Sequence, residues 1–586
     1  MNLISFNIEE NFLNNRESKV INRKKNLLFH HGCLNNKLFD EKKIKHSIVD
    51  IHEIKNRKLK KRKIQFIKQT YDKLLEHLTK KLNSAHGLDF KKTYWEILIG
   101  KWLYTLVYQS YLNWEILNKI EKKYKLNFFF QLNLNGNLFI PENTLHSHTQ
   151  VRGQSKFNLF HHWLISKMVI FKNSIKVKKI NLKKNLKIEK EIKKLNKPIT
   201  VQNIFYKSIN NKFFYYLWDV PKIIKFYFMK KYKFINLNLK KKEINKFLTK
   251  EIKRKQLFKF KNNNNKKFIS FMKSILQYVT PKIFLENFNS LEYELSKLSW
   301  PKKPKYILTS YPYYEEVFKY YCAKNKMLGS KVIITQHGYD NIFKYEDWFP
   351  NKIYDSFQLS WGNNKKKGLK EFFFTKIFKK KEKFTFKKKN KIIFILYALT
   401  EMEERLPDGY ISNHNINKLI YNSSNYFLKN IKRNLARKIE IKSLQLTKFS
   451  ILNNSLKRKF NNLKFLNIEK PFIDVINNYN LSVHFFLGTP FFESLYLNRP
   501  CILILNKKIQ LEFDKNFSDF ISIFIKKNIC FENLQSAVNF INTNYNNIDK
   551  WWNKSDTQST IDKFCECYCK RTENLDKELK KLRFKN

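Results

Sequence analysis

The sequence predicts an α/β fold built from two doubly wound parallel-sheet domains that face a cleft. Its 586 residues are too many for one compact core. From residue 304 onward, short apolar strands alternate with helix-forming segments, and this alternation is typical of parallel sheets. A lysine-rich connector at 364–390 divides these segments into two sets. We therefore predict an N-terminal domain over 1–385 and a C-terminal domain over 386–586.

The N-terminal half is expected to carry helical insertions. The stretch "KNLLFHHGC" at 25–33 predicts a short buried strand. Residues 55–125 place apolar side chains at helical spacing. Residues 165–290 are rich in Lys, Asn, Ile and Phe, which favours helices with long solvated faces and a loop at 261–267.

The second half predicts strands and helices in strict alternation. Pro312 near the start and Gly329 just past the end bound the first of these helices. The expected strands are 304–310, 331–338, 355–362, 391–399, 438–446, 481–486 and 501–505. The expected helices are 312–328, 415–437, 471–479 and 490–497.

Charge leaves two interpretations open. The chain has 115 Lys+Arg against 49 Asp+Glu, a net charge of +66, which is typical of proteins that bind nucleic acid or an anionic membrane. Lys, Asn, Ile and Phe share A/T-rich codons, however, and compositional bias is the favoured explanation of the lysines. No RNA-recognition motif or C2H2 pattern is present, so we expect no nucleic-acid partner.

Cysteine usage and hydropathy indicate a cytoplasmic protein. The seven cysteines are odd in number and irregular in spacing, which argues against a disulfide framework. "FCECYC" predicts a helix carrying small apolar side chains rather than a metal clip. The N-terminus lacks a cationic leader, and no run of 18 uncharged apolar residues appears, so neither a signal peptide nor a membrane span is expected.

The segment "LSVHFFLGTPFFESLYLNRPCILIL" at 481–505 carries the clearest chemical signal. A strand ends before Gly488, which permits a tight turn, and Thr489 is a good helix N-cap. The helix then begins at the carboxyl edge of a sheet, where its N–H groups favour phosphate. Glu493, one turn in, can accept hydrogen bonds from ribose hydroxyls. The alternative is that Glu493 only stabilises the start of the helix.

Several motifs resemble known families. "GTPFFESLYLNRPCILI" is similar to the nucleotide-binding turn of GT-B glycosyltransferases. Together with "LNSAHGLDFKKTYWEILIGKWL", "PKKPKYILTS", "KVIITQHGYDN", "FQLSWG" and the late "WW", it resembles a transferase family associated with bacterial O-antigen and surface-polysaccharide gene clusters. Where that family has a basic, histidine-containing stretch, this chain has only Lys442 and Lys448. The resemblance covers most of the chain and is weakest between 120 and 290.

The resemblance implies a GT-B-like enzyme with an N-terminal acceptor-side domain and a C-terminal nucleotide-donor domain. His337, at the end of a parallel strand, is the candidate catalytic base or phosphate ligand, with a purely structural histidine as the alternative. Gly338 allows close backbone approach to the ligand. The expected donor-binding residues are Gln336, Gly338, Arg405 (matching a family arginine), Gly488, Thr489 and Glu493.

The expected reaction moves a sugar from a nucleotide-activated donor, bound as substrate, to a glycan or lipid-linked glycan acceptor, with no metal and no cofactor. Peripheral contact with the anionic inner face of the cytoplasmic membrane is a further expectation. The alternative function is a non-catalytic basic module that binds nucleic acid or anionic lipid. We expect His30, His31 and His86 near the same cleft, and His146 and His148 in a polar loop.

Overall fold

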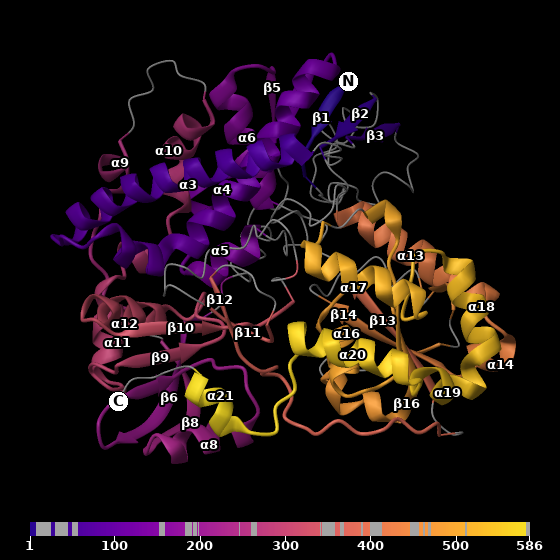
Figure 1. Ribbon diagram of the computed structural model, residues 1–586. Helices are drawn as coiled ribbons and strands as arrows, with labels where there is room; N and C mark the ends of the chain where they lie inside the picture. Colours follow the sequence, from indigo (N-terminus) through magenta and orange to yellow (C-terminus); the bar gives the residue numbers. More distant parts are fainter. Residues whose placement is uncertain are drawn as a thin grey trace.

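Three parallel β-sheets organise the chain in the computed structural model (Figure 1). The α/β class is therefore confirmed, although the sequence predicts two such sheets and the described residues form three. The structure describes residues 1–6, 25–29, 45–49, 57–151, 159–181, 190, 196, 198–244, 247–259, 267–339, 342, 358–363, 368–387, 391–398, 413–445, 456, 458–460, 463–466, 470–509 and 512–581.

Sheet I lies beside the N-terminus and has the strand order β3-β2-β1-β4-β5, with every neighbouring pair parallel. The helix α4 is buried along most of its length, which explains the aromatic stripe that the sequence places there. The strands are β1 (Asn2–Ile4), β2 (Asn26–Leu28), β3 (His46–Ile48), β4 (Phe128–Leu132) and β5 (Val177–Ile180). The helices of this part are α3 (Arg57–His86), α4 (Lys92–Lys123), α5 (Thr144–Val151), α6 (Leu159–Lys172), α9 (Arg254–Leu257), α10 (Phe268–Val279) and α11 (Asn289–Ser296).

Sheet II has the order β12-β11-β10-β9-β7 and is also entirely parallel. Successive side chains of β10 enter different cores, because Val332 and Ile334 join the cluster under sheet I while Ile333 joins a cluster on the other face. This burial of both faces explains the unbroken apolar run that the sequence shows. The elements are β7 (Phe213–Tyr215), α8 (Lys222–Lys231), β9 (Tyr306–Thr309), α12 (Glu316–Met327), β10 (Lys331–Thr335), β11 (Gln358–Ser360) and β12 (Leu369–Glu371).

Sheet III has the order β15-β14-β13-β16-β17-β18 and lies on the right of Figure 1. Its strands are β13 (Lys391–Ala398), β14 (Ile439–Gln445), β15 (Lys464–Phe465), β16 (Tyr479–His484), β17 (Cys501–Ile504) and β18 (Cys530–Phe531). Its helices are α13 (Asn413–Asn430), α14 (Arg433–Ala436), α16 (Thr489–Tyr496), α17 (Lys515–Lys526), α18 (Leu534–Asn544), α19 (Ile548–Trp552) and α20 (Ser555–Tyr568). The last helix, α21 (Leu575–Lys581), returns to sheet II, where Leu575 and Leu579 pack beside Ile333.

Two expectations for the lysine-rich segments are wrong. Residues 165–290 are not mainly helical, because β6 (Thr200–Ser208) and β8 (Phe234–Glu243) form an antiparallel pair and β7 joins sheet II. The described part of the 364–390 connector is not a solvated linker, because it contains β12 and buried phenylalanines such as Phe374 and Phe384. In the first segment the aromatic residues Phe213 and Phe214 supply buried faces of β7, and in the second the buried phenylalanines follow β12 in irregular chain.

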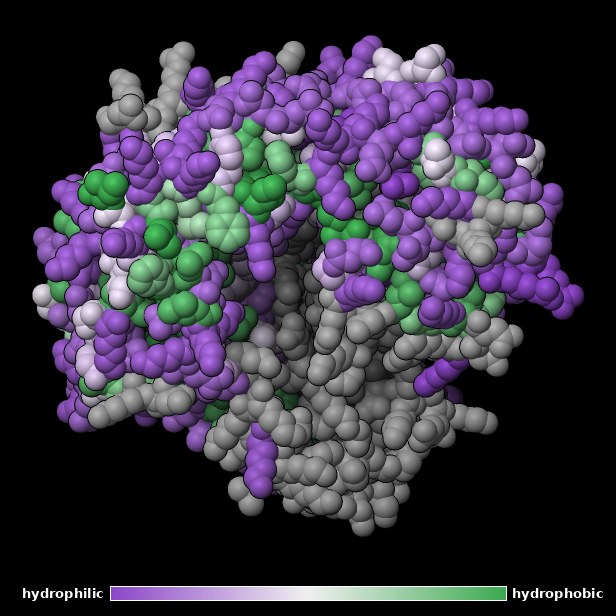
Figure 2. Space-filling view, turned by 90° about the horizontal axis from the view of Figure 1, so that it is seen from below, coloured by the Kyte–Doolittle hydropathy of each residue, from purple (hydrophilic) through white to green (hydrophobic). Residues whose placement is uncertain are grey.

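The predicted elements of the second half are otherwise recovered, with 471–479 forming two 3-10 turns, Phe472–Asp474 and Ile476–Asn478, instead of a regular helix. Seen from below, the surface is hollowed between the half with β6 and β8 and the half with sheet III (Figure 2). Within the described residues, no helix has both the length and the apolar character that a membrane span requires.

Candidate active site

The loop after β10 places His337 at the carboxyl edge of sheet II. Gln336 fixes this loop, because its side-chain oxygen accepts from the Trp361 N–H at 2.8 Å and its amide donates to the Gly338 carbonyl at 2.7 Å. Gln336 is buried, whereas half of the His337 side chain is exposed. Gln336 and Gly338 therefore shape the loop, and His337 is the side chain that solvent can reach.

His337 pairs with a carboxylate that the sequence analysis missed. Its Nδ1 lies 3.0 Å from Oδ2 of Asp219, and the Lys376 ammonium donates to the same oxygen. A carboxylate only accepts hydrogen bonds, so the proton of a neutral His337 ring resides on Nδ1 and the lone pair on Nε2. The pair has the arrangement of a carboxylate-oriented general base.

Asp219 is held by the ends of two strands of sheet II. Its N–H donates to the Ser310 hydroxyl at 2.9 Å, and that hydroxyl lies 2.6 Å from the Thr335 hydroxyl. Ser310 follows β9, Thr335 ends β10 and Asp219 follows β7. One sequence feature could have indicated Asp219. The run "FFYYLWDV" at 213–220 is an apolar stretch that ends in a single carboxylate inside a lysine-rich segment.

The helix α16 carries Glu493 and begins at the carboxyl edge of sheet III. Its N-cap is Gly488 rather than Thr489, and no side chain caps it. Gly488 has φ −160°, an extended conformation open to any residue, and an added Cβ would make an ordinary 3.6 Å contact with Pro490. The expected tight turn at Gly488 and N-cap role of Thr489 are therefore wrong. The carboxyl-edge position of the helix is as expected.

Glu493 and Lys376 influence each other's ionisation. Desolvation raises the pKa of Glu493 to about 7, against the pull of Lys376, and Asp474 raises it further. Desolvation lowers the pKa of Lys376 to about 8, and the nearby Glu493 carboxylate opposes this shift. Both side chains are half-buried. Glu493 on α16 and Lys376 in the chain after β12 thus both have pKa values shifted toward neutral pH, a feature that is frequent in active sites.

The chain after His337 also contacts two helices that pack beside sheet III, α16 and α17. The ring of Tyr339 lies parallel to that of Phe492, with centroids 6.4 Å apart. Further on, the Ile342 carbonyl accepts from the N–H of Asp514, the N-cap of α17, at 2.9 Å. The chain after β10, which carries His337, therefore lies against α16, the helix that carries Glu493.

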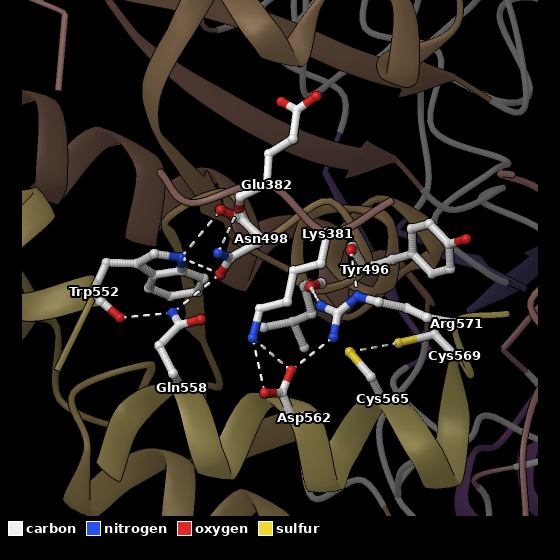
Figure 3. Close-up of polar contacts among 11 residues, drawn as sticks. Lys381, Glu382, Tyr496, Asn498, Trp552, Gln558, Asp562, Cys565, Cys569 and Arg571 are labelled. Atoms are coloured by element: carbon white, nitrogen blue, oxygen red, sulfur yellow. Dashed lines mark hydrogen bonds and ion pairs between the residues drawn. The ribbon is translucent and has the colours of Figure 1, made fainter. Parts of the chain in front are cut away.

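The other end of α16 is anchored by the chain that follows α20 (Figure 3). Arg571 donates to the carbonyls of Leu495 and Tyr496, at 2.6 and 2.8 Å, and to the Asp562 carboxylate at 2.7 Å. Lys381 shares that carboxylate. A cation at the last carbonyls of a helix offsets the negative end of its dipole. This anchor fixes the helix that carries Glu493 one turn after its start.

The histidines predicted elsewhere have structural surroundings. His146 and His148 are buried on α5, not in a polar loop, and His148 lies 3.1 Å from the Tyr314 hydroxyl. The ring centroid of Tyr314 lies 5.6 Å from that of Tyr311, and the Tyr311 centroid lies 5.0 Å from that of His337. His148 is therefore linked to His337 through two tyrosine rings. His86 has structural contacts, because its ring stacks on Phe288 and its Nε2 lies 3.0 Å from the Phe284 carbonyl oxygen.

Arg405, Lys448, His30 and His31 lie outside the described residues, so their expected roles remain predictions. Searching the described residues for His, Cys, Asp and Glu side chains gathered in threes or more to hold a metal ion finds no such group.

Comparison with known proteins gives one extensive match. A family model described as LIC12162 family transferase matches residues 16–582. No curated protein matches the sequence. Among solved structures, the chain is similar to a protein described as a UDP-N-acetylglucosamine 2-epimerase from Listeria monocytogenes, with 8% identity and a TM-score of 0.28 over 50% of this chain and 83% of that chain.

Proposed function

The chain belongs to the LIC12162 family of transferases, and we propose that it transfers a glycosyl group from a nucleotide-activated sugar to a surface-glycan acceptor. The observation that carries this proposal is the His337–Asp219 pair. Lys376 donates a hydrogen bond to Asp219 and interacts electrostatically with Glu493, so it links this pair to α16. A transfer between two substrates requires a base near the acceptor and a binding site for the phosphates of the donor. His337 after a strand of sheet II would supply the first, and the start of α16 beside sheet III would supply the second.

In the proposed reaction, Nε2 of His337 accepts the proton of an acceptor hydroxyl. The hydroxyl oxygen forms a bond to the anomeric carbon of the donor as the bond from that carbon to the phosphate oxygen breaks. The nucleoside diphosphate leaves with the bonding electrons. Asp219 stabilises the imidazolium that forms, and Lys376 and the N–H groups at the start of α16 stabilise charge on the diphosphate.

We assign donor binding to the region where the chain after β10 lies against the start of α16. Glu493 would accept hydrogen bonds from the ribose hydroxyls, and the loop of Gln336 and Gly338 would supply the facing wall. The acceptor would approach from the side of sheet II, next to His337. These assignments make the part before β13 the acceptor side and the part after it the donor side, in the manner of GT-B enzymes.

Nucleotide binding is tested first, by a thermal-shift screen of nucleotides and nucleotide sugars at fixed salt. We expect at least one to raise the melting temperature. Glu493→Ala should weaken its binding by about 10- to 100-fold, the effect of removing hydrogen bonds to a charged group. Glu532→Ala is the matched control, because Glu532 follows β18 at the edge of the same sheet and pairs with Lys507. Equal affinity in both variants would remove Glu493 from the donor site.

Turnover with the donor so identified tests His337. His337→Ala should reduce turnover by about 10²- to 10⁴-fold, because the general base is lost. His337→Gln separates two roles, since glutamine can donate to phosphate but cannot take up a proton near neutral pH. Near-normal turnover in the glutamine variant would leave phosphate binding as the role, and near-normal turnover in the alanine variant would refute both. His77→Gln on α3 serves as the control.

A further inference from the structure

One face of the β6–β8 pair is apolar and exposed. Four side chains on this face are 40–55% exposed: Phe205, Ile235, Leu237 and Leu239. Phe205 lies directly opposite Leu237 in the antiparallel register, so these side chains form one continuous strip. The opposite face packs inward, because Ile204, Phe234 and Asn236 are buried. A two-stranded sheet with an uncovered apolar face is unusual in water.

Three further exposed hydrophobic side chains lie close in sequence to this strip. Ile209, after β6, is 84% exposed, and Ile223 and Phe226 on the outer side of α8 are 57% and 56% exposed. Within the described residues, sixteen large hydrophobic side chains are exposed, and seven of them lie between 205 and 239. Figure 2 shows hydrophobic side chains among hydrophilic ones on the half that holds β6, β8 and α8. We call these seven residues the β6–α8 face.

Lysines surround the β6–α8 face. Residues 200–243 contain ten lysines and two acidic residues, Asp219 and Glu243. The Asp219 carboxylate pairs with His337 and Lys376 at the active site. Three of the lysines pair with carboxylates of other segments: Lys231, Lys241 and Lys242. On the strip itself, Lys207 lies opposite Ile235 in the register. The β6–α8 face therefore combines exposed apolar side chains with lysine side chains from the same segment of the chain.

We propose that the β6–α8 face docks on an anionic lipid bilayer. Bulky apolar side chains that enter the interface, flanked by lysines that reach phosphate headgroups, are the chemistry of peripheral membrane binding. The charge favours this occupant over a second copy of the chain, which would bring an identical set of lysines against this one. The phosphates of a nucleic acid would pair with the lysines, but they would also lie against the apolar strip, which cannot form favourable contacts with them.

The location of this face bears on the proposed transfer. The hollow between the two halves of the molecule is seen from the same direction as the half with β6, β8 and α8 (Figure 2). A bilayer under that half would lie next to the hollow and could present a lipid-linked acceptor to it. This consequence rests on the proposed function, whereas the docking itself does not.

Docking is measured by vesicle co-sedimentation of the full chain without nucleotide or acceptor, so that the result does not depend on transferase activity. The vesicles are phosphatidylcholine, alone or with about one third phosphatidylglycerol. We expect binding to the mixed vesicles at about 0.1 M salt, at least about tenfold less binding at about 0.5 M salt, and little binding to phosphatidylcholine alone.

Two double variants identify the face. Phe226→Ser with Leu239→Ser should reduce binding to mixed vesicles by at least about tenfold. Ile170→Ser with Ile523→Ser is the matched control, because these side chains of α6 and α17 are 49% and 39% exposed, and it should bind like the wild type. Circular dichroism confirms that each variant is folded.

Lys207→Gln with Lys233→Gln is a second test that keeps every apolar side chain, and it should weaken binding and reduce its salt dependence. The proposal is overturned if the serine variants at 226 and 239 bind like the control pair, or if neutral vesicles bind equally well. It is also overturned if sedimentation shows a dimer that those serine variants abolish.

Discussion

Replacing Glu493 by glutamine tests the electrostatics of the site without removing the side chain. The pKa of Glu493 rises from its ordinary value of 4.5 to about 7, with desolvation as the largest cause. Folded chains therefore keep this proton between pH 4.5 and 7, while unfolded chains release it. The resulting stabilisation is fully present below pH 4.5 and is lost as the pH rises through about 7. Glutamine has no proton to release, so Glu493→Gln lacks this pH dependence.

The magnitude follows from the two pKa values. A difference of about 2.5 between them corresponds to about 3 kcal/mol. Because the Glu493 side chain is only half-buried, this is an upper value. We expect the free energy of unfolding of the wild type, relative to Glu493→Gln, to fall by at most about 3 kcal/mol between pH 4.5 and 8, and to be level above that range.

Urea unfolding at a series of pH values measures this difference, and Glu440→Gln gives a control of opposite sign. Burial opposes ionisation of Glu440, but hydrogen bonds from Lys391, Tyr479 and Lys464 outweigh it and hold its pKa below the ordinary value. The stabilisation from Glu440 is therefore present above the unfolded pKa and is lost as the pH falls through the folded one. Parallel curves for wild type and Glu493→Gln from pH 4 to 8 would refute the reasoning.

Three further predictions address other parts of the molecule. Asp219→Asn should lower turnover by about 10²-fold with little change in the KM for the donor, because it weakens stabilisation of the His337 imidazolium; unchanged turnover would contradict the pairing. Gly362→Ala should lower the melting temperature, because its Cβ would lie 2.5 Å from the Cys567 carbonyl oxygen; an unchanged melting temperature in a calorimetric scan would show that this approach relaxes freely. Lys319→Met should cost about 3–5 kcal/mol in urea unfolding, because it strips the fully buried Glu316 of its ion pair at 2.7 Å, and a loss under about 1 kcal/mol would contradict this.

The local sequence pattern was sufficient to predict most strands and helices of the second half of the chain. Strands β9, β10, β13, β14, β16 and β17 and helix α16 fall where apolar runs and their Gly and Pro boundaries predict them, and Gly329 has φ +93° just past α12. A strand that is buried on both faces needs apolar residues at every position, so it can be recognised from a short stretch of sequence. The lysine-rich first half was harder, since β6 and β8 bury only one face and their alternation is hidden among lysines.

The sequence by itself determined the α/β class, the strand that ends at His337 and the helix that carries Glu493. Only the tertiary structure decided that Asp219 would pair with His337, because those residues are 118 positions apart and meet through the strand order of sheet II. Only the tertiary structure placed Lys376 between Asp219 and Glu493, so that two pKa values approach neutrality. Spacing along a chain fixes which side chains share a strand or a helix face, whereas the partners of a charge depend on which sheet edges meet.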